Sequence, residues 1–447
     1  MNRRVALKWQ IACVAAAALA LPAGAYAGWS PPRDIRQSGD AVSTVVATAG
    51  PRADFLGFPG RGEDGILTRS PFGRRPSRAV VQRTGFDGIG AFSLSPTPGG
   101  RLAAGWGWYD GSDLDDPDVD SDPCCTRAVA AVWSPGKKPR RKVLSPPGYD
   151  SAGADAAAGP RGVNLFLWGG RDGMHVTREH EGRFADQTIR PVPAPPVGGS
   201  PLIDAAVDLT FRADGRALLS WVAPGAEGTV AVWAATSDRA GRFGAPEQVG
   251  AIRADEFTST KILTDRRGGQ IIVWTQSEEV TGRQTLMASD RAPEGTFGPP
   301  QAVARGDFSY TDAAIGAGGD AVVTWSRGTE GRAVIYVSRR PSRGAFGRSV
   351  RLTRERVDEE TAAGVDARGR TMVLYAVRER RGQVRSRVAA RERPFGRPTT
   401  VSAPTGNRPG CFQPRLAVAP DGHAVGAWRC MGERLTIDGA QGAVYSP

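Results

Sequence analysis

Short apolar runs, separated by glycine-containing turns, recur along the chain. From Ala205 the sequence reads AAVDLTFRADGRALLSWVAPGAEGTVAVWAATSDRAGRFGAPEQV: an apolar run, an Asp-Gly turn, a second run ending in an aromatic, a third run, and a fourth that opens with Phe-Gly. The same order returns in ILTDRRGGQIIVWTQ, AAIGAGGDAVVTWSR, AGVDARGRTMVLYAV and LAVAPDGHAVGAWRC. Runs and turns of this kind predict four β-strands in a meander.

An aromatic residue ends the second run of every unit. A repeat of roughly 50 residues is typical of a four-stranded propeller blade rather than of a helical repeat. We therefore predict an all-β fold, an eight-bladed β-propeller of four-stranded antiparallel blades, in which the aromatics pack between blades. The eight positions, with spacings of 48, 62, 53, 53, 51, 50 and 53 residues, are Phe58, Trp106, Trp168, Trp221, Trp274, Trp325, Tyr375 and Trp428.

The end of the chain points to a way of closing the ring. No Phe-Gly strand follows Trp428, whereas residues 28–36 resemble the fourth strands of other units, such as residues 244–249. We expect this N-terminal strand to complete the last blade, because closure removes exposed sheet edges. An open array with a frayed last unit is the alternative. The units of this single domain are expected at about 41–88, 89–148, 149–200, 201–253, 254–305, 306–354, 355–403 and 404–447 plus 28–38.

Residues 1–27 have the features of an export signal. The basic start with Arg3, Arg4 and Lys8 precedes an Ala-rich apolar stretch, and Ala25-Tyr26-Ala27 offers a cleavage site. The paired arginines resemble a twin-arginine signal, and both this route and plain Sec export stay open. We predict a secreted monomer that begins at Gly28. No later apolar run reaches the ~18 residues that span a bilayer.

Composition and charge narrow the choice of partners. The chain is 40% hydrophobic and 23% charged, as in ordinary soluble proteins. Its 58 Gly and 34 Pro favour strands and turns over long helices. Lys and Arg (58) exceed Asp and Glu (46), giving a net charge of +12. Basic clusters lie at 137–142 and 378–397, but they lack the interleaved aromatics on which bases stack, so we do not expect nucleic acid as a partner.

Four cysteines remain after the predicted signal. Outside the cytoplasm they should be oxidised. The pairing we favour is Cys411 with Cys430 and a vicinal Cys124–Cys125 bridge. A vicinal bridge needs a strained ring, so free or cross-paired thiols stay open as alternatives.

Candidate binding residues lie where each unit enters its first strand. In a propeller these loops and the loops between the second and third strands share one face, around the central channel. Carboxylates and flat rings at such a funnel recognise sugars or peptides, whereas ordinary turn chemistry is the alternative reading. The acid and aromatic residues in these stretches are Phe86, Asp87, Tyr149, Asp150, Asp255, Phe257, Asp307 and Tyr310.

An acidic insertion at 110–122 falls on the same face. Alternating carboxylates are hard oxygen ligands that suit calcium, the one cofactor the sequence suggests. The loop lacks the glycine and the closing glutamate of an EF-hand, so a solvated acidic loop is the alternative reading. The candidate ligands are Asp116, Asp118, Asp120 and Asp122.

Catalytic motifs are missing from the sequence. There is no G-x-S-x-G elbow, P-loop or H-E-x-x-H helix, and the chain has only 3 His. From Ala205 onward the repeat resembles that of uncharacterised secreted β-propeller proteins of high-GC bacteria. The general architecture also resembles that of sialidases, but turns such as 213–216 lack the Ser and the Thr-Trp of an Asp-box. The resemblance implies a fold and not an activity.

The function we expect is non-catalytic binding of an extracellular or cell-wall ligand, a glycan or a protein, at the funnel face. A glycan-active hydrolase or lyase that uses carboxylates at that face is the first alternative. A structural scaffold for protein interaction is the second.

Overall fold

The computed structural model shows an all-β chain. In the part of the chain that the structure describes, no helix has the length and apolar content needed to cross a membrane. The predicted signal, the acidic insertion, and Cys124 and Cys125 lie outside the described residues. These are 28–36, 42–49, 53–59, 65–70, 77–82, 89–96, 100–109, 126–134, 137–146, 151, 154–170, 173–189, 207–224, 229–253, 257–277, 283–328, 332–377, 382–402, 410–431 and 437–447.

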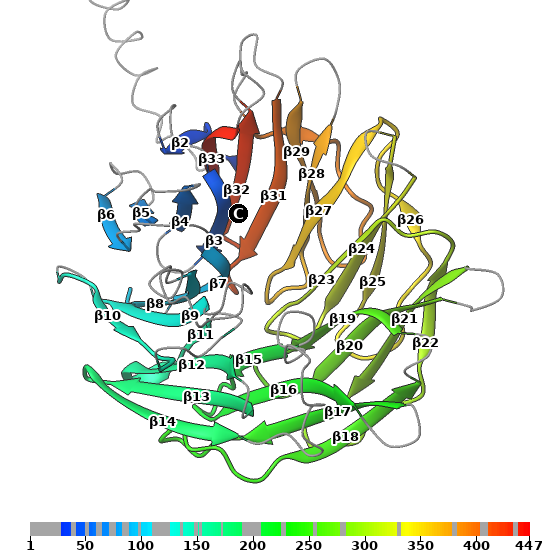
Figure 1. Ribbon diagram of the computed structural model, residues 1–447. Helices are drawn as coiled ribbons and strands as arrows, with labels where there is room; N and C mark the ends of the chain where they lie inside the picture. Colours follow the sequence, from blue (N-terminus) through cyan, green and yellow to red (C-terminus); the bar gives the residue numbers. More distant parts are fainter. Residues whose placement is uncertain are drawn as a thin grey trace, which may run out of the picture.

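Most strands form four-stranded antiparallel meanders that follow the chain in order (Figure 1). The first contains β3 (Val42–Ala49), β4 (Ala53–Pro59), β5 (Gly65–Ser70) and β6 (Ser77–Gln82). Four more are β15 (Val207–Phe211), β16 (Ala217–Pro224), β17 (Thr229–Thr236) and β18 (Glu247–Arg253); β19 (Phe257–Thr264), β20 (Gln270–Ser277), β21 (Gln284–Arg291) and β22 (Gln301–Arg305); β23 (Tyr310–Ile315), β24 (Ala321–Arg327), β25 (Val334–Arg340) and β26 (Val350–Arg351); and β27 (Val357–Val365), β28 (Thr371–Val377), β29 (Gln383–Ala389) and β30 (Thr399–Thr400).

Two meanders merge into one eight-stranded sheet, which the sequence did not predict. Their first strands, β7 and β11, pair in parallel through Phe92 and Ala154. Gly105 allows this close approach, because a Cβ there would lie 2.3 Å from the carbonyl oxygen of Ala154. The strands of this sheet are β7 (Ile89–Pro96), β8 (Leu102–Tyr109), β9 (Thr126–Trp133), β10 (Arg140–Val143), β11 (Ala154–Ala158), β12 (Val163–Gly170), β13 (Gly173–His180) and β14 (Arg183–Ile189), with a 3-10 turn at Pro160–Gly162.

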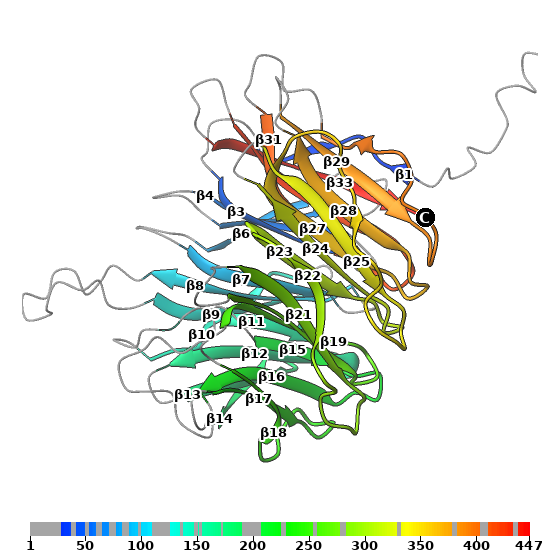
Figure 2. The same cartoon turned by 90° about the vertical axis from the view of Figure 1, so that its right-hand side faces the viewer.

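The last sheet joins the two ends of the described chain. It contains β31 (Gly410–Val418), β32 (Ala424–Met431) and β33 (Ile437–Ser446), with β1 (Gly28–Trp29) and β2 (Arg33–Arg36) both paired to β33. Figure 2 shows β1 beside β33. The Ser30 amide donates to the Val444 carbonyl at 2.7 Å, and the Trp29 ring meets Tyr445 edge-on at 5.6 Å. Residues 28–36 thus supply outer strands to this sheet.

The first strands of the meanders lie around a common axis. Contacts join them in cyclic order: β3 to β7, β7 to β11, β11 to β15, β15 to β19, β19 to β23, β23 to β27, β27 to β31, and β31 back to β3. This is the arrangement of a β-propeller, in which the first strands line a central channel and the fourth strands form the rim.

The core lies between neighbouring sheets. One apolar cluster combines Leu165 and Val176 with Leu219 and Trp233 of the next meander, and others span later pairs of sheets in the same way. The second-strand aromatics are at most 3% exposed wherever their side chains are described, which confirms the packing role predicted for them. These are Trp106, Trp168, Trp221, Trp274, Trp325, Tyr375 and Trp428.

Candidate functional site

A ring of side chains lines the channel at one level. Its members pair, strand to strand, with the residue just before the second-strand aromatic, as Asp208 pairs with Ser220 before Trp221. Each stands thirteen positions before the aromatic of its own unit. The channel ring consists of Ser93, Asp155, Asp208, Lys261, Asp312, Ala362 and Arg415, and the backbone of Val45 has the equivalent register position in the first meander.

Charged members of the channel ring hold neighbouring sheets together. Lys261 forms an ion pair with Asp312 of the next sheet. The other carboxylate oxygen of Asp312 accepts a hydrogen bond from the Ala363 amide of the sheet beyond, at 2.8 Å. Ser93 likewise accepts from the Ala156 amide. These contacts fix the spacing of strands β7, β11, β19, β23 and β27 around the axis.

Asp208 is the perturbed acid of the channel ring. Burial away from water is the main cause that raises its pKa, to about 6. Hydrogen bonding to Thr264 acts in the opposite direction, the negative charge of Asp155 raises the pKa further, and Lys261 lowers it. The channel therefore holds a carboxyl group that changes charge close to neutral pH.

A polar network occupies the end of the channel where the first strands begin, which is the face predicted from the sequence. The Gln413 amide nitrogen donates to Glu360 at 3.2 Å, and Arg429 donates to the Gln413 amide oxygen. Arg415 lies 3.8 Å from the other carboxylate oxygen of Glu360. Tyr310 completes this mouth network: burial, followed by the charge of Asp312, raises its pKa to about 12, although Arg415 acts in the opposite sense.

Irregular pairing sets the geometry of this end. The register between first and second strands shifts at Val42/Thr44, Ile89/Phe92, Phe257/Ser259, Val357/Thr361 and Phe412/Arg415. Each shift lies just before or at the channel ring. Bulges re-aim side chains and recur beside binding sites. The last one places Gln413 at φ 50°, a left-handed conformation that a non-glycine residue adopts only under constraint.

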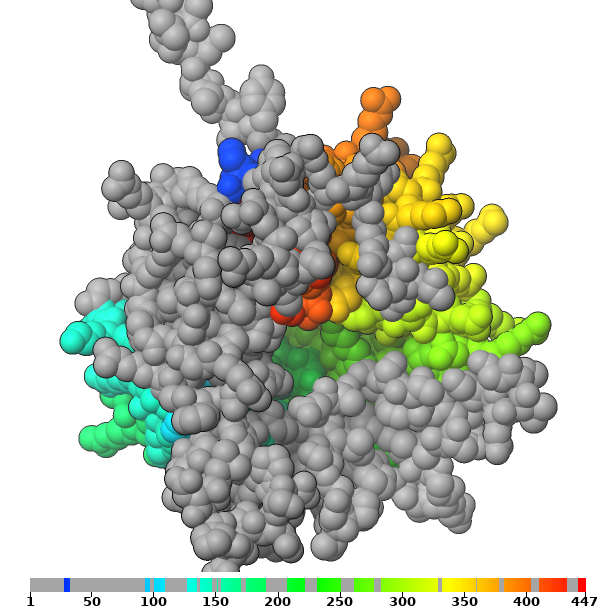
Figure 3. Space-filling model, turned by 45° about the horizontal axis from the view of Figure 1, so that its top comes forward, coloured from blue at the N-terminus to red at the C-terminus, as the bar shows by residue number. Residues whose placement is uncertain are grey.

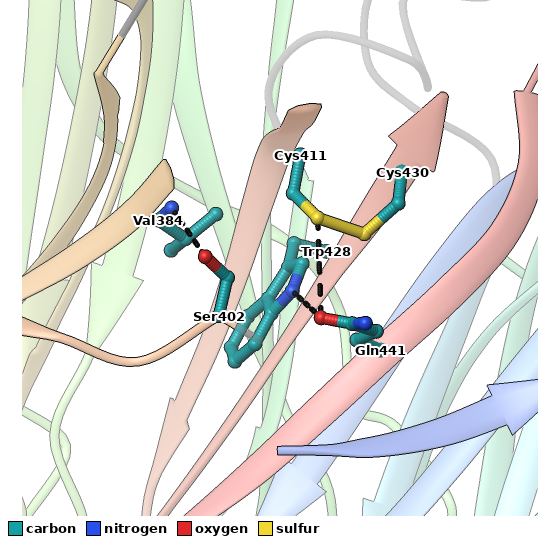
Figure 4. The surroundings of a disulfide bond; sticks show 6 residues. All are labelled: Val384, Ser402, Cys411, Trp428, Cys430 and Gln441. Carbon is teal, nitrogen blue, oxygen red and sulfur yellow. Dashed lines mark hydrogen bonds between the residues drawn. A yellow bond between two sulfur atoms is a disulfide. The ribbon is translucent and has the colours of Figure 1, made fainter. Parts of the chain in front are cut away.

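A disulfide supports the bulge that carries Gln413. Cys411 and Cys430 are partners in the β31–β32 register and form a bond of 2.07 Å, as predicted (Figure 4). Beside it the Trp428 indole donates to Gln441 at 3.2 Å. Because the bridge joins the two strands two residues from Gln413, it holds the start of β31 in place.

The predicted binding residues lie in different surroundings. Tyr310 is part of the mouth network. Asp307 is exposed and has no ion pair or hydrogen-bond partner in the described chain, while the neighbouring Phe308 packs edge-on against Trp325 at 6.4 Å. Phe257 starts β19, and its side chain is not described. The candidates outside the described residues are Phe86, Asp87, Tyr149, Asp150, Asp255, Asp116, Asp118, Asp120 and Asp122.

The opposite end of the channel contains a cavity that the sequence did not indicate. Its volume is about 440 Å³, and its walls are the closing residues of seven first strands, from Ser95 and Ala158 to Val365 and Val418. Its lining mixes small and apolar residues with the charged residues Arg212, Asp265 and Arg266, and Ser95 is already engaged by the Ala158 amide at 2.8 Å. Across the described ranges, no group of three or more His, Cys, Asp or Glu is arranged to hold a metal ion.

Three comparisons with known proteins were informative to different degrees. No protein-family model and no curated protein matches the sequence, whereas solved structures do. Among solved structures, the BP39L lectin from Burkholderia pseudomallei aligns with a TM-score of 0.52 at 12% identity, over 82% of this chain and 100% of the lectin. The polysaccharide lyase Uly1 aligns with a TM-score of 0.47 at 11% identity, over 96% of this chain and 94% of that one. An α-L-arabinanase from Penicillium chrysogenum aligns with a TM-score of 0.38 at 12% identity, over 65% and 91%. At 12% identity the likeness to the lectin concerns the fold alone.

Proposed function

We propose that the chain is exported, that its mature part from Gly28 is a closed ring of eight units, and that it binds an extracellular or cell-wall glycan at the mouth network without catalysis. The observation that carries the proposal is the strained, bulged Gln413, held by Glu360 and Arg429 at the channel mouth. Backbone strain persists where surrounding structure enforces it, which is typical of ligand clamps.

The chemistry of the mouth network suits a sugar. An amide, a carboxylate and a guanidinium offer fixed donors and acceptors, and pairs of neighbouring hydroxyls can satisfy both kinds of group. Arg429 also lies over the Phe412 ring at 5.6 Å, which helps to fix the position of its guanidinium group at the mouth. That a lectin shares the propeller fold supports the capacity of such a scaffold to hold sugars.

Binding is favoured over hydrolysis because acids of the mouth network and the channel ring are already engaged by cations. Glu360 forms an ion pair with Arg415, and Asp312 forms one with Lys261. One observation favours the hydrolase alternative: Asp208, whose pKa is raised to about 6, lies next to Asp155 in the channel ring, and glycoside hydrolases act through pairs of carboxyl groups.

A glycan and cell-wall polymer array tests the proposal. Residues 28–447 are applied with and without calcium, which also tests the acidic insertion. Gln413→Gly is then titrated against the best glycan. Glycine adopts φ 50° without strain, so the fold should be kept while affinity falls at least tenfold. Glu181→Gly, at φ 51° in the turn between β13 and β14, is the control and should bind as the parent does.

Three outcomes separate the alternatives. Binding of no glycan overturns the proposal, and so does equal binding by Gln413→Gly. Breakdown of a bound glycan, lost in Asp208→Asn, would establish the hydrolase instead. Capture of protein without glycan binding would favour the scaffold.

A further inference from the structure

A second polar site lies on the rim, between sheets β23–β26 and β27–β30. This arginine groove has a volume of about 580 Å³. Figure 3 shows this part of the chain, in yellow and orange, at the edge of the molecule. Two acids, Asp320 and Glu392, face a larger set of guanidinium groups: Arg339, Arg340, Arg348, Arg351, Arg387 and Arg391.

The seam beside this groove lacks a side-chain clamp that two other seams contain. In this clamp, a glutamine on the fourth strand of one sheet binds the backbone of a phenylalanine in the next sheet. The phenylalanine belongs to the Phe-Gly pair that precedes the fourth strand of that sheet. Gln187 exchanges two hydrogen bonds with Phe243, both of 2.9 Å, and Gln301 exchanges two with Phe346, both of 2.8 Å. The strand register puts Val350 at the equivalent position. Valine has no hydrogen-bonding group, and Val350 is 54% exposed.

Half of the arginines already have partners. Arg340 pairs with Asp290, and Arg391 pairs with Asp320 at 3.0 Å. Arg339 donates to the carbonyls of Ala390 and Arg393 at 3.1 and 2.7 Å, and it covers the Phe395 ring at 5.2 Å. These three guanidinium groups build the walls of the groove.

The other arginines are available to a ligand. Among the described residues, no carboxylate forms an ion pair with Arg348, Arg351 or Arg387. Arg351 uses one nitrogen to donate to the Thr353 carbonyl at 2.8 Å. The Arg387 Nε is buried without any hydrogen-bond partner. A buried donor without an acceptor is costly, so it points to an acceptor that arrives from outside.

We propose that the arginine groove binds the oxyanion groups, carboxylate or sulfate, of an acidic polysaccharide. Guanidinium groups recognise such oxyanions through paired, charge-assisted hydrogen bonds. Val350 and Pro394 provide apolar surface beside them for the faces of sugar rings. The site is separate from the mouth network, so this inference goes beyond the proposed function and does not rest on it.

Polysaccharide is favoured over nucleic acid by the aromatic content of the groove. Single-stranded nucleic acid is held by bases that stack on free rings. Phe395 is the sole ring that lines the groove, and Arg339 already lies over it. The groove can therefore neutralise charge but has no free ring to stack a base.

The test titrates residues 28–447 with a defined oligogalacturonate and a defined heparin oligosaccharide, with inorganic sulfate and single-stranded DNA as further arms. We expect the double variant Arg348→Gln/Arg351→Gln to bind at least tenfold more weakly than the parent. The comparison uses whichever of the two oligosaccharides the parent binds more tightly. Arg183→Gln/Arg239→Gln removes the same charge from exposed positions of other sheets and should stay within twofold of the parent.

A second variant separates loss of binding from loss of folding. Val350→Gln restores the clamp glutamine, which can bond the Phe395 backbone and occupy the groove. It should weaken oligosaccharide binding at least tenfold and leave the melting temperature unchanged or higher.

The proposal is overturned if neither oligosaccharide binds, if the control double variant loses as much affinity, or if Val350→Gln folds and binds like the parent. Binding of DNA as tight as that of the oligosaccharide, or of inorganic sulfate alone, also overturns it. The two oligosaccharide arms show whether carboxylate or sulfate is preferred. Failure of this test leaves the Gln413→Gly experiment unaffected.

Discussion

At the residue scale, one position per unit decides what the channel can do. The strand register brings the residues of the channel ring to the same level, so their side chains interact across sheets although their units lie far apart in sequence. Lys261 stabilises Asp312 directly, whereas Asp208 is half-buried beside Asp155 and is poorly solvated. Two aspartates at equivalent positions are therefore held in different environments.

Replacing Asp208 by asparagine should stabilise the protein more at high pH than at low pH. An unfolded aspartate titrates near ~3.9, whereas Asp208 in the folded protein has a pKa of about 6. The folded state binds the proton more tightly, so the stability carried by protonated Asp208 is complete below pH ~4 and is lost as the pH rises through 6. Asparagine does not titrate. We expect the unfolding free energy of Asp208→Asn, relative to that of the parent, to increase by ~1–3 kcal/mol from pH 4 to pH 7.5. Urea unfolding at the two pH values measures this difference.

Asp312→Asn is the matched control for this prediction. Its carboxylate accepts from Lys261 and from the Ala363 amide, so its loss should lower stability at pH 7.5. If the advantage of Asp208→Asn does not grow with pH, the raised pKa of Asp208 is wrong.

At the element scale, the register of each sheet explains both what the sequence predicts and what it does not. The second-strand aromatics follow from the repeat alone, because each sheet must cover its neighbour at the same place. The channel ring also has a sequence signature, a fixed offset from Trp221 or Trp274, but it becomes meaningful only once the strand pairing is known. Residues 28–36 were recognisable because they resemble the other fourth strands.

Apart from Tyr310, the mouth network could not be predicted in the same way. Glu360 and Gln413 stand within strands whose pairing shifts, at Val357/Thr361 and Phe412/Arg415. Bulges change which side chains face the channel, and no periodic pattern marks them. The parallel contact of β7 with β11 likewise depends on the backbone space left at Gly105.

The glutamine clamp should stabilise the contact between neighbouring sheets, and this can be tested by mutation. Gln301 satisfies both the amide and the carbonyl of Phe346, a residue only 6% exposed. Gln301→Ala leaves both groups without a partner, which should cost ~1–3 kcal/mol of unfolding free energy. Thr399 occupies the equivalent position of β30 and is exposed, so Thr399→Ala should change stability by less than ~0.5 kcal/mol. Equal effects in urea unfolding would refute the clamp.

At the scale of the whole molecule, each sheet is stable because its neighbours cover its faces. Apolar clusters join successive pairs of sheets, and the indole of Trp29 packs against the last of them beside Leu416 and Tyr445. Such a chain leaves an open seam unless its ends meet. A closed ring therefore requires that β33 hold the segment 28–36 as firmly as internal strands hold one another.

Hydrogen exchange of the mature protein tests this most directly. The amides of residues 28–36 and 437–446 are followed together by mass spectrometry in the native state. A sealed ring predicts that both segments exchange slowly and at similar rates, because opening the seam requires global unfolding. Exchange of 28–36 within seconds, while 437–446 stays protected by β32, would contradict the closed ring.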